Sequence, residues 1–139
     1  MIYVHDIIAI ASLAVRVSIA YKDAPADYRH ISKKVAALKL LIDRSAPHFK
    51  RSTISQEDYH YGEKVLKSCQ GVLEDLGSLI EKYKRLASIN KRHVLNRVKI
   101  CKDITALQVR LTSNTVLFNG FIRRCVVHFI NPMDVNTSI

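Results

Sequence analysis

The 139-residue sequence is poor in residues that break helices, since it contains four glycines and three prolines. A β-rich domain changes direction every few residues and draws on glycine and proline for its turns. This shortage argues against a strand-and-turn fold and favours long uninterrupted segments. Apolar residues make up 48% of the chain, as in ordinary globular proteins, and the length is sufficient for one domain with its own core.

Cysteine is also scarce, and Cys69, Cys101 and Cys125 are far apart in the sequence. No CxxC pair and no Cys/His cluster occurs at the spacing of a zinc site. The sequence therefore predicts no metal. An odd number of isolated cysteines is typical of reduced, buried thiols in the cytosol, and not of a secreted disulfide framework.

Motifs of catalysis and of nucleotide binding are missing. The chain has no GxxxxGK[ST] phosphate loop, no GxGxxG, no GxSxG and no HExxH. Glu74 and Asp75 are adjacent, so they point in different directions on a helix and do not form a carboxylate pair. We predict a protein that is not an enzyme and that uses no cofactor. A catalytic site assembled from distant residues would leave no such motif.

The first apolar run, residues 7–21, lacks the features of a secretion signal and of a membrane span. No Lys or Arg precedes it, and Asp6 stands directly before it, whereas a signal peptide begins with positively charged residues. A membrane span needs about 20 apolar residues. This run is shorter and contains Arg16, which costs about 2.5–3.5 kcal/mol at a bilayer centre. We expect a helix over 6–21, with Asp6 as its N-cap, that is largely surrounded by other helices.

Three further segments carry apolar residues at alternating steps of three and four, which predicts helices. Their expected bounds are 25–46, 55–86 and 90–126. Pro47 is expected to end the second helix, while Ser55 and Asn90 are the N-caps of the third and fourth. The apolar seam of the third helix consists of Val65, Cys69, Val72, Leu76, Leu79, Tyr83 and Leu86.

Four helices with short links can bury such stripes only against each other. We therefore predict an all-α fold, an antiparallel bundle of four helices whose third and fourth members are long. The bundle is expected over residues 1–126, and residues 127–139, which include Asn131-Pro132, are expected to be an irregular tail. Gly71 and Gly77 interrupt the third helix at a cost of about 1 kcal/mol each, so we expect another helix to approach closely there.

The net charge of +10 is unevenly distributed. Residues 22–51 carry eight basic and three acidic residues, residues 52–81 carry two and six, and residues 82–110 carry nine and one. A candidate basic patch consists of Lys82, Lys84, Arg85, Lys91, Arg92, Arg97, Lys99 and Lys102. Its simplest interpretation is a solvated face, and the alternative is an anionic membrane surface or acidic partner. Nucleic acid is the least favoured partner, because no recognition motif or interleaved stacking aromatics are present.

Three segments in order carry a family resemblance: AYKDAPADYRHISKKVAALKLLI (20–42), VLEDLGSLIEKYKRLAS (72–88) and DITALQVRLTSNTVLFNGFI (103–122). Together they resemble the fungal N-terminal helical domain of STAND and NLR-type proteins, which is related to HeLo and HeLo-like domains. The resemblance implies a helical bundle that precedes a NACHT module or ankyrin repeats and acts in signal transduction, non-self recognition or programmed cell death. The partners it implies are the chain itself or homologous helical domains.

In HeLo relatives the N-terminal helix attacks membranes after oligomerisation. By that resemblance the candidate membrane or partner helix contains Ile7, Ile8, Ile10, Leu13 and Val17. The 139 residues include no NACHT or repeat region, and the first helix lacks a glycine zipper. Two interpretations of residues 6–21 stay open, a plain core helix and a helix released to a membrane. The protein is expected in the cytoplasm, with peripheral membrane binding as the alternative, and not to be secreted.

Overall fold

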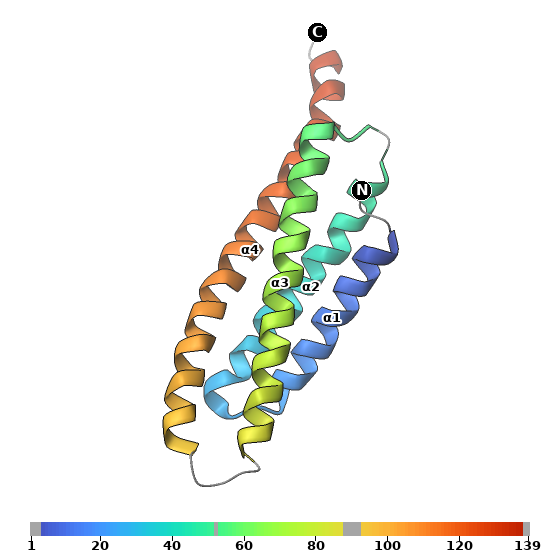
Figure 1. The fold of residues 1–139 in the computed structure, drawn as a ribbon. Helices are drawn as coiled ribbons and strands as arrows, with labels where there is room; N and C mark the ends of the chain where they lie inside the picture. The colour runs from blue at the N-terminus through green and yellow to red at the C-terminus, as the bar shows by residue number, and fades with distance from the viewer. Residues whose placement is uncertain (1–3, 52, 88–92, 138–139) are drawn as a thin grey trace.

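The structure, a computed structural model, describes residues 4–51, 53–87 and 93–137. These residues are all helical or in turns and contain no strand, which confirms the predicted all-α bundle of four helices. Its elements are α1 (Val4–Lys22), the 3₁₀ turn η1 (Ala26–Tyr28), α2 (Arg29–Lys50), α3 (Gln56–Ala87) and α4 (His93–Thr137). Each helix runs antiparallel to the next, and α3 and α4 are the long members, as expected (Figure 1).

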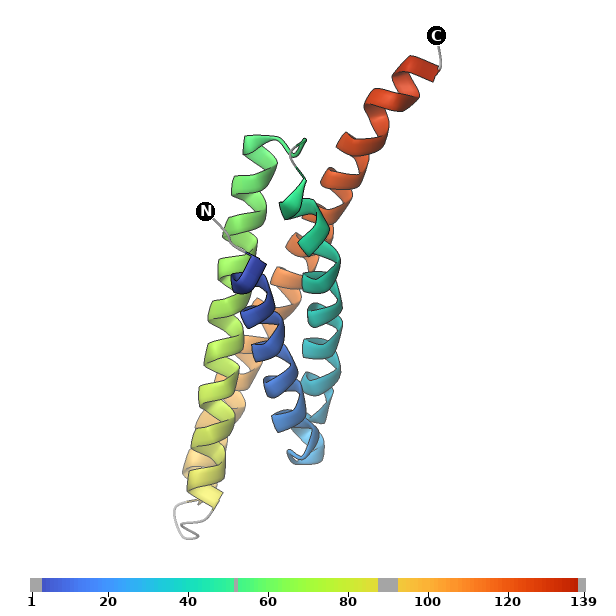
Figure 2. The same cartoon turned by 90° about the vertical axis from the view of Figure 1, so that its right-hand side faces the viewer.

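The four helices pack as two antiparallel hairpins. The hairpin of α1 and α2 lies on the hairpin of α3 and α4, with α1 next to α3 and α2 next to α4. Helices α1 and α4 are therefore at opposite corners. Figure 2 shows α1 in front of the bundle, with α4 behind it. This arrangement leaves one side of α1 without a neighbouring helix.

The core is continuous through all four helices. Five of the residues predicted for the seam of α3 are buried: Val65, Cys69, Val72, Leu76 and Leu79. Tyr83 is half-buried, and the side chain of Leu86 lies outside the described part of the chain. Leu66, Leu73 and Ile80 are buried as well. The buried face of α3 is therefore wider than the predicted seam, because α3 packs against both α1 and α4.

Of the three predicted N-caps, one is confirmed, one is wrong and one lies outside the described residues. The backbone N–H of Asp58 donates to Oγ of Ser55 at 3.1 Å, so Ser55 caps α3 as predicted. Asp6 is not an N-cap, because α1 begins at Val4 and Asp6 is in its first turn, where an acid still interacts favourably with the helix dipole. The predicted cap Asn90 lies outside the described residues.

Two prolines do not end their helices. Pro47 lies inside α2, which continues to Lys50, although the sequence predicted an end near residue 46. Proline removes one hydrogen bond, here to the carbonyl of Asp43, and both residues are exposed, so water can reach the region. Pro132 lies inside α4, which continues to Thr137, where an irregular segment was expected. The end of α4 projects beyond the other helices (Figure 2).

The glycines of α3 have different surroundings from those expected. A Cβ at Gly71 would lie 3.7 Å from Nη2 of Arg110, and one at Gly77 would lie 3.6 Å from Cγ2 of Val17. Both are ordinary contact distances, so close packing does not require glycine at either position. A Cβ at Gly62, in contrast, would lie 2.5 Å from Cε1 of Phe121. The close approach is therefore at Gly62, which the sequence did not single out.

Candidate functional site

The five candidate residues of α1 do not share one environment. Ile7, Ile10 and Val17 are buried in the core, and Leu13 is half-buried. Ile8 points outward, with 60% of its surface exposed. Three of the five therefore act in holding α1 to the bundle. Any contact with a membrane or a partner through these three would require α1 to leave its place.

A different set of α1 residues faces solvent. Ile8, Val15 and Ile19 are large apolar residues with exposed fractions of 60%, 41% and 59%, and Ser12 is exposed between them. We call these four residues the outer stripe. The expectation that α1 is largely surrounded by other helices is therefore wrong. α1 packs on α2 and α3, and no helix among the described residues covers its remaining side (Figure 2).

Polar contacts anchor the second half of α1. Oγ of Ser18 donates to the carbonyl oxygen of Ser32 at 2.9 Å, and Oγ of Ser32 donates to the carbonyl oxygen of Ser18 at 2.7 Å. The hydroxyl of Tyr21, which is fully buried, donates to the carbonyl oxygen of Leu76 at 2.7 Å. Burial raises the pKa of Tyr21 well above its ordinary value. These contacts fix the register of α1 on α2 and on α3.

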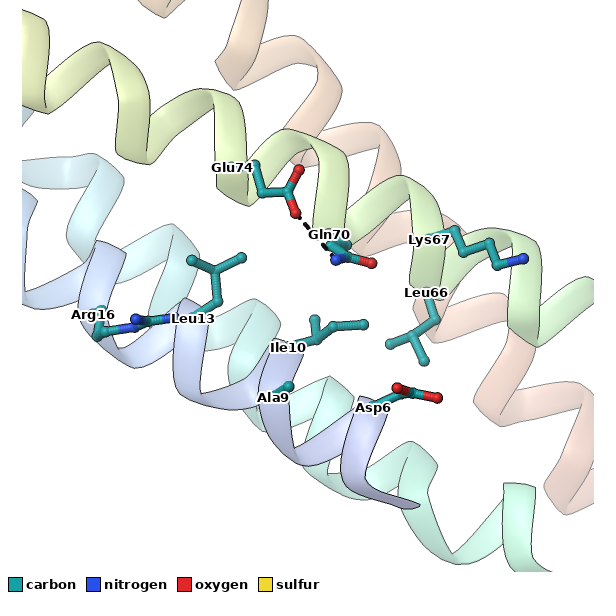
Figure 3. A pocket seen from close by; sticks show the side chains of 9 residues that line it. All are labelled: Asp6, Ala9, Ile10, Leu13, Arg16, Leu66, Lys67, Gln70 and Glu74. Carbon is teal, nitrogen blue, oxygen red and sulfur yellow. Dashed lines mark hydrogen bonds between the residues drawn. The ribbon is translucent and has the colours of Figure 1, made fainter. Parts of the chain in front are cut away.

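A groove of about 470 Å³ separates the first half of α1 from α3. Its lining is Asp6, Ala9, Ile10, Leu13, Arg16, Leu66, Lys67, Gln70 and Glu74. Figure 3 shows an apolar floor between polar ends, with Arg16 and Glu74 toward one end and Asp6 and Lys67 toward the other. Nε2 of Gln70 donates to Oε1 of Glu74 at 3.1 Å. The groove thus combines both signs of charge around an apolar floor.

The predicted basic patch is described in part. Lys84, Arg85 and Lys102 are exposed, and Lys82 is half-buried. Lys91 and Arg92 lie outside the described residues, as do the side chains of Arg97 and Lys99. The described members lie near the end of the bundle where the chain passes from α3 to α4. The chain also turns from α1 to α2 at this end (Figure 1).

Basic residues from two distant stretches of sequence thus gather at one end of the bundle. The exposed basic residues near the α1–α2 turn are Lys22, Arg29, Lys33 and Lys34. Asp23, Glu81 and Asp103 are at the same end, and they are fewer than the basic side chains there. The convergence of the two basic stretches was not visible in the sequence, because it depends on how the two hairpins are aligned.

At the other end, a buried acid connects α3 to α4. The side chain of Asp58 is 2% exposed, and its Oδ1 lies 2.9 Å from Nη2 of Arg124. The guanidinium of Arg124 also lies over the ring of Tyr61, 5.0 Å from its centroid. The two partners are 66 residues apart in the sequence, and no local pattern of the sequence indicates their contact. These contacts stabilise the packing of α4 on α3.

The cysteines and one asparagine are internal. Cys69 and Cys125 are buried and unpaired with another cysteine, as predicted, and the side chain of Cys101 lies outside the described residues. Burial raises the pKa of Cys69 to about 12, which keeps its thiol protonated. Asn114 is also buried, and its Oδ1 accepts a hydrogen bond from Oγ of Ser68 at 2.9 Å. These groups are part of the core.

Metal-binding and membrane-spanning features were sought in the same part of the chain. Within residues 4–51, 53–87 and 93–137, no three His, Cys, Asp or Glu side chains are grouped so that they could hold a metal ion. No helix in those ranges has both the length and the apolar character that crossing a bilayer requires.

Comparison with known proteins identifies no relative. No family model matches the chain, and no curated protein or solved structure matches it.

Proposed function

We propose that the chain is a non-enzymatic interaction module that associates with copies of itself or with homologous helical domains. The observation that most supports this proposal is the position of α1. A helix with so few charged residues is normally buried on all sides, yet α1 keeps Ile8, Val15 and Ile19 in water. The groove beside α1 supports the same proposal, because an apolar floor with charged ends is typical of surfaces that bind other helices.

The biological setting that we propose is signal transduction in non-self recognition or programmed cell death. Its support is the resemblance of residues 20–42, 72–88 and 103–122 to the N-terminal domain of fungal NLR-type proteins. We place the protein in the cytoplasm.

Light scattering coupled to size exclusion tests the proposed self-association. A monomer has a mass of 15.8 kDa, and we expect the measured mass to rise above this value as the protein concentration increases. Homologous helical domains, added in excess, are expected to co-elute with the chain. A constant monomer mass up to high concentration, together with no binding of homologous domains, would contradict the proposal.

The second candidate function is that of a membrane-active effector that uses α1 and the basic end of the bundle. The observation that favours it is the meeting of two basic stretches at that end. Each basic residue near an anionic membrane contributes about 1 kcal/mol of attraction. Flotation with anionic and with zwitterionic vesicles, combined with dye release, tests this function. If neither the natural chain nor Arg16→Leu binds anionic vesicles, this candidate is eliminated.

A further inference from the structure

We propose that the outer stripe of α1 is the surface through which two copies of this chain associate, with their α1 helices antiparallel about a two-fold axis. This inference rests on the proposed self-association and names its surface. The stripe consists of Ile8, Ser12, Val15 and Ile19, all exposed.

The first argument is the mismatch between the composition of α1 and its surroundings. Among its 19 residues, the charged side chains are Asp6, Arg16 and Lys22, with His5 as the further titratable group. A helix at the corner of a bundle normally has a polar outward side. Here the outward side carries Ile8 and Ile19, each about three-fifths exposed. Something apolar that covers the stripe would resolve this mismatch.

The second argument is that the stripe is complementary to itself. Its residues follow steps of four, three and four, a pattern that reads the same in both directions. When two such helices pack antiparallel, Ile8 of one copy lies opposite Ile19 of the second copy, and Ser12 lies opposite Val15 of the second copy. The small Ser12 leaves room for the branched Val15. A two-fold axis makes each of these contacts twice, as isologous interfaces do.

The third argument is the distribution of charge beside the exposed apolar residues. On α1 itself, the charged residues near the outer stripe are Asp6, Arg16 and Lys22. The basic residues of the α1–α2 turn lie at the Ile19 end of the stripe, together with Asp23: Arg29, Lys33 and Lys34. On α4, the exposed Val109 and Val116 have basic residues nearby, namely Lys102, Arg110 and Arg123. Two antiparallel α4 helices would therefore bring Lys102 of one copy toward Arg123 of the second copy. Two antiparallel α1 helices instead bring the basic Ile19 end of one copy toward Asp6 of the second copy. Membrane-surface helices usually have a polar face rich in Lys and Arg, which α1 lacks.

The size of the stripe limits the strength of the association. A helix of 19 residues is about 28 Å long and about 10 Å wide, so two α1 helices alone bury less than the roughly 1,200 Å² of a standard interface. We therefore expect a weak dimer, with a dissociation constant in the micromolar range or above. Each copy also carries a net charge of +10. Because salt screens the repulsion between copies, the dimer is expected to become tighter as the salt concentration rises.

Two double variants test the surface. Ile8→Lys/Ile19→Lys places two charges in the outer stripe, and Val109→Lys/Val116→Lys adds the same charge at two exposed positions on α4. The replaced residues are 60% and 59% exposed in the first variant and 65% each in the control. In sedimentation velocity we expect the α1 variant to raise the dissociation constant at least tenfold and the control to change it less than threefold. Thermal unfolding followed by circular dichroism checks that both variants fold.

A third variant tests the antiparallel arrangement. In Ile8→Asp/Ile19→Lys, an antiparallel dimer brings opposite charges together, whereas a parallel dimer brings like charges together. This variant is therefore expected to associate more tightly than Ile8→Lys/Ile19→Lys. The matched pair on α4, Val109→Asp/Val116→Lys and Val109→Lys/Val116→Lys, measures the effect of net charge alone and is expected to differ less.

The outcomes separate this inference from the proposed function. If the natural chain is monomeric and binds no homologous domain, the proposed function fails, and the inference fails with it. If the natural chain associates and Ile8→Lys/Ile19→Lys associates equally well, the inference alone is wrong. Loss of association in Val109→Lys/Val116→Lys but not in the α1 variant would also overturn it and would assign the surface to α4. Equal association of the Asp/Lys and Lys/Lys variants of α1 would overturn the antiparallel register.

Discussion

Replacing Gly62 by alanine gives the sharpest test of how tightly one end of the bundle is packed. The new Cβ would lie 2.5 Å from Cε1 of Phe121 and 2.8 Å from Cζ of Phe49. The ring of Phe121 has little room to move away. Phe121 is fully buried, and it stacks on Phe49 with ring centroids 5.0 Å apart. It also packs edge-on against Phe118, at 6.2 Å.

The magnitude follows from two opposing effects. Alanine is more favourable than glycine inside a helix by about 1 kcal/mol, whereas an extra methyl group in a close-packed core costs about 1–3 kcal/mol. We expect Gly62→Ala to lower the free energy of unfolding by up to about 2 kcal/mol. Gly71→Ala and Gly77→Ala are the matched controls in the same helix. Their Cβ atoms would make ordinary contacts at 3.7 and 3.6 Å, so each is expected to stabilise the fold by up to about 1 kcal/mol.

Urea denaturation at equilibrium, followed by circular dichroism, measures all three variants. The informative quantity is the difference between Gly62→Ala and the two controls, because helix propensity contributes equally to all three. If Gly62→Ala is as stabilising as Gly71→Ala, Phe121 and Phe49 are not held in the positions described, and the reasoning is refuted.

Three further predictions concern buried polar groups. Tyr21→Phe removes the hydrogen bond to the carbonyl of Leu76 and is expected to lower the free energy of unfolding by about 1 kcal/mol; no change in urea denaturation would argue against that bond. Arg124→Met removes the ion pair between Arg124 and the buried acid of Asp58, and because Arg124 is 41% exposed, we expect a loss of about 1–3 kcal/mol, whereas Arg123→Met at an exposed neighbour should have little effect. Burial raises the pKa of Cys69 above its ordinary value, to about 12, so the unfolded state loses its thiol proton first, and the free energy of unfolding should fall as the pH rises through the alkaline range toward 12. Alkaline urea titrations of the natural chain and of Cys69→Ala measure this fall, and an equal pH dependence in both would contradict it.

Helix positions and the main core register could be predicted because they depend on local sequence. The alternating three-and-four spacing identified the buried face of α3, and Ser55 was recognisable as a cap three residues before Asp58. At the prolines, the local sequence predicted the helix ends wrongly. Local preference opposes a helix at Pro47, but one lost hydrogen bond near a helix end is a small part of the energy of a packed helix.

The features of the candidate site depend on contacts between distant residues, which one sequence does not display. The apolar run of α1 indicated a helix largely surrounded by other helices, and only the order of packing, with α1 and α4 at opposite corners, leaves Ile8 and Ile19 in water. Likewise, the need for glycine at position 62 arises from Phe121, a residue of another helix. The basic end of the bundle arises from the alignment of two hairpins.

The most direct test of this account is sedimentation equilibrium of the unmodified chain over a wide range of concentration, at low and at high salt. We expect an average mass that rises from 15.8 kDa toward twice that value, and that rises at lower concentrations when salt is high. An average mass that stays at the monomer value under all these conditions would contradict the claim that α1 presents a surface for self-association.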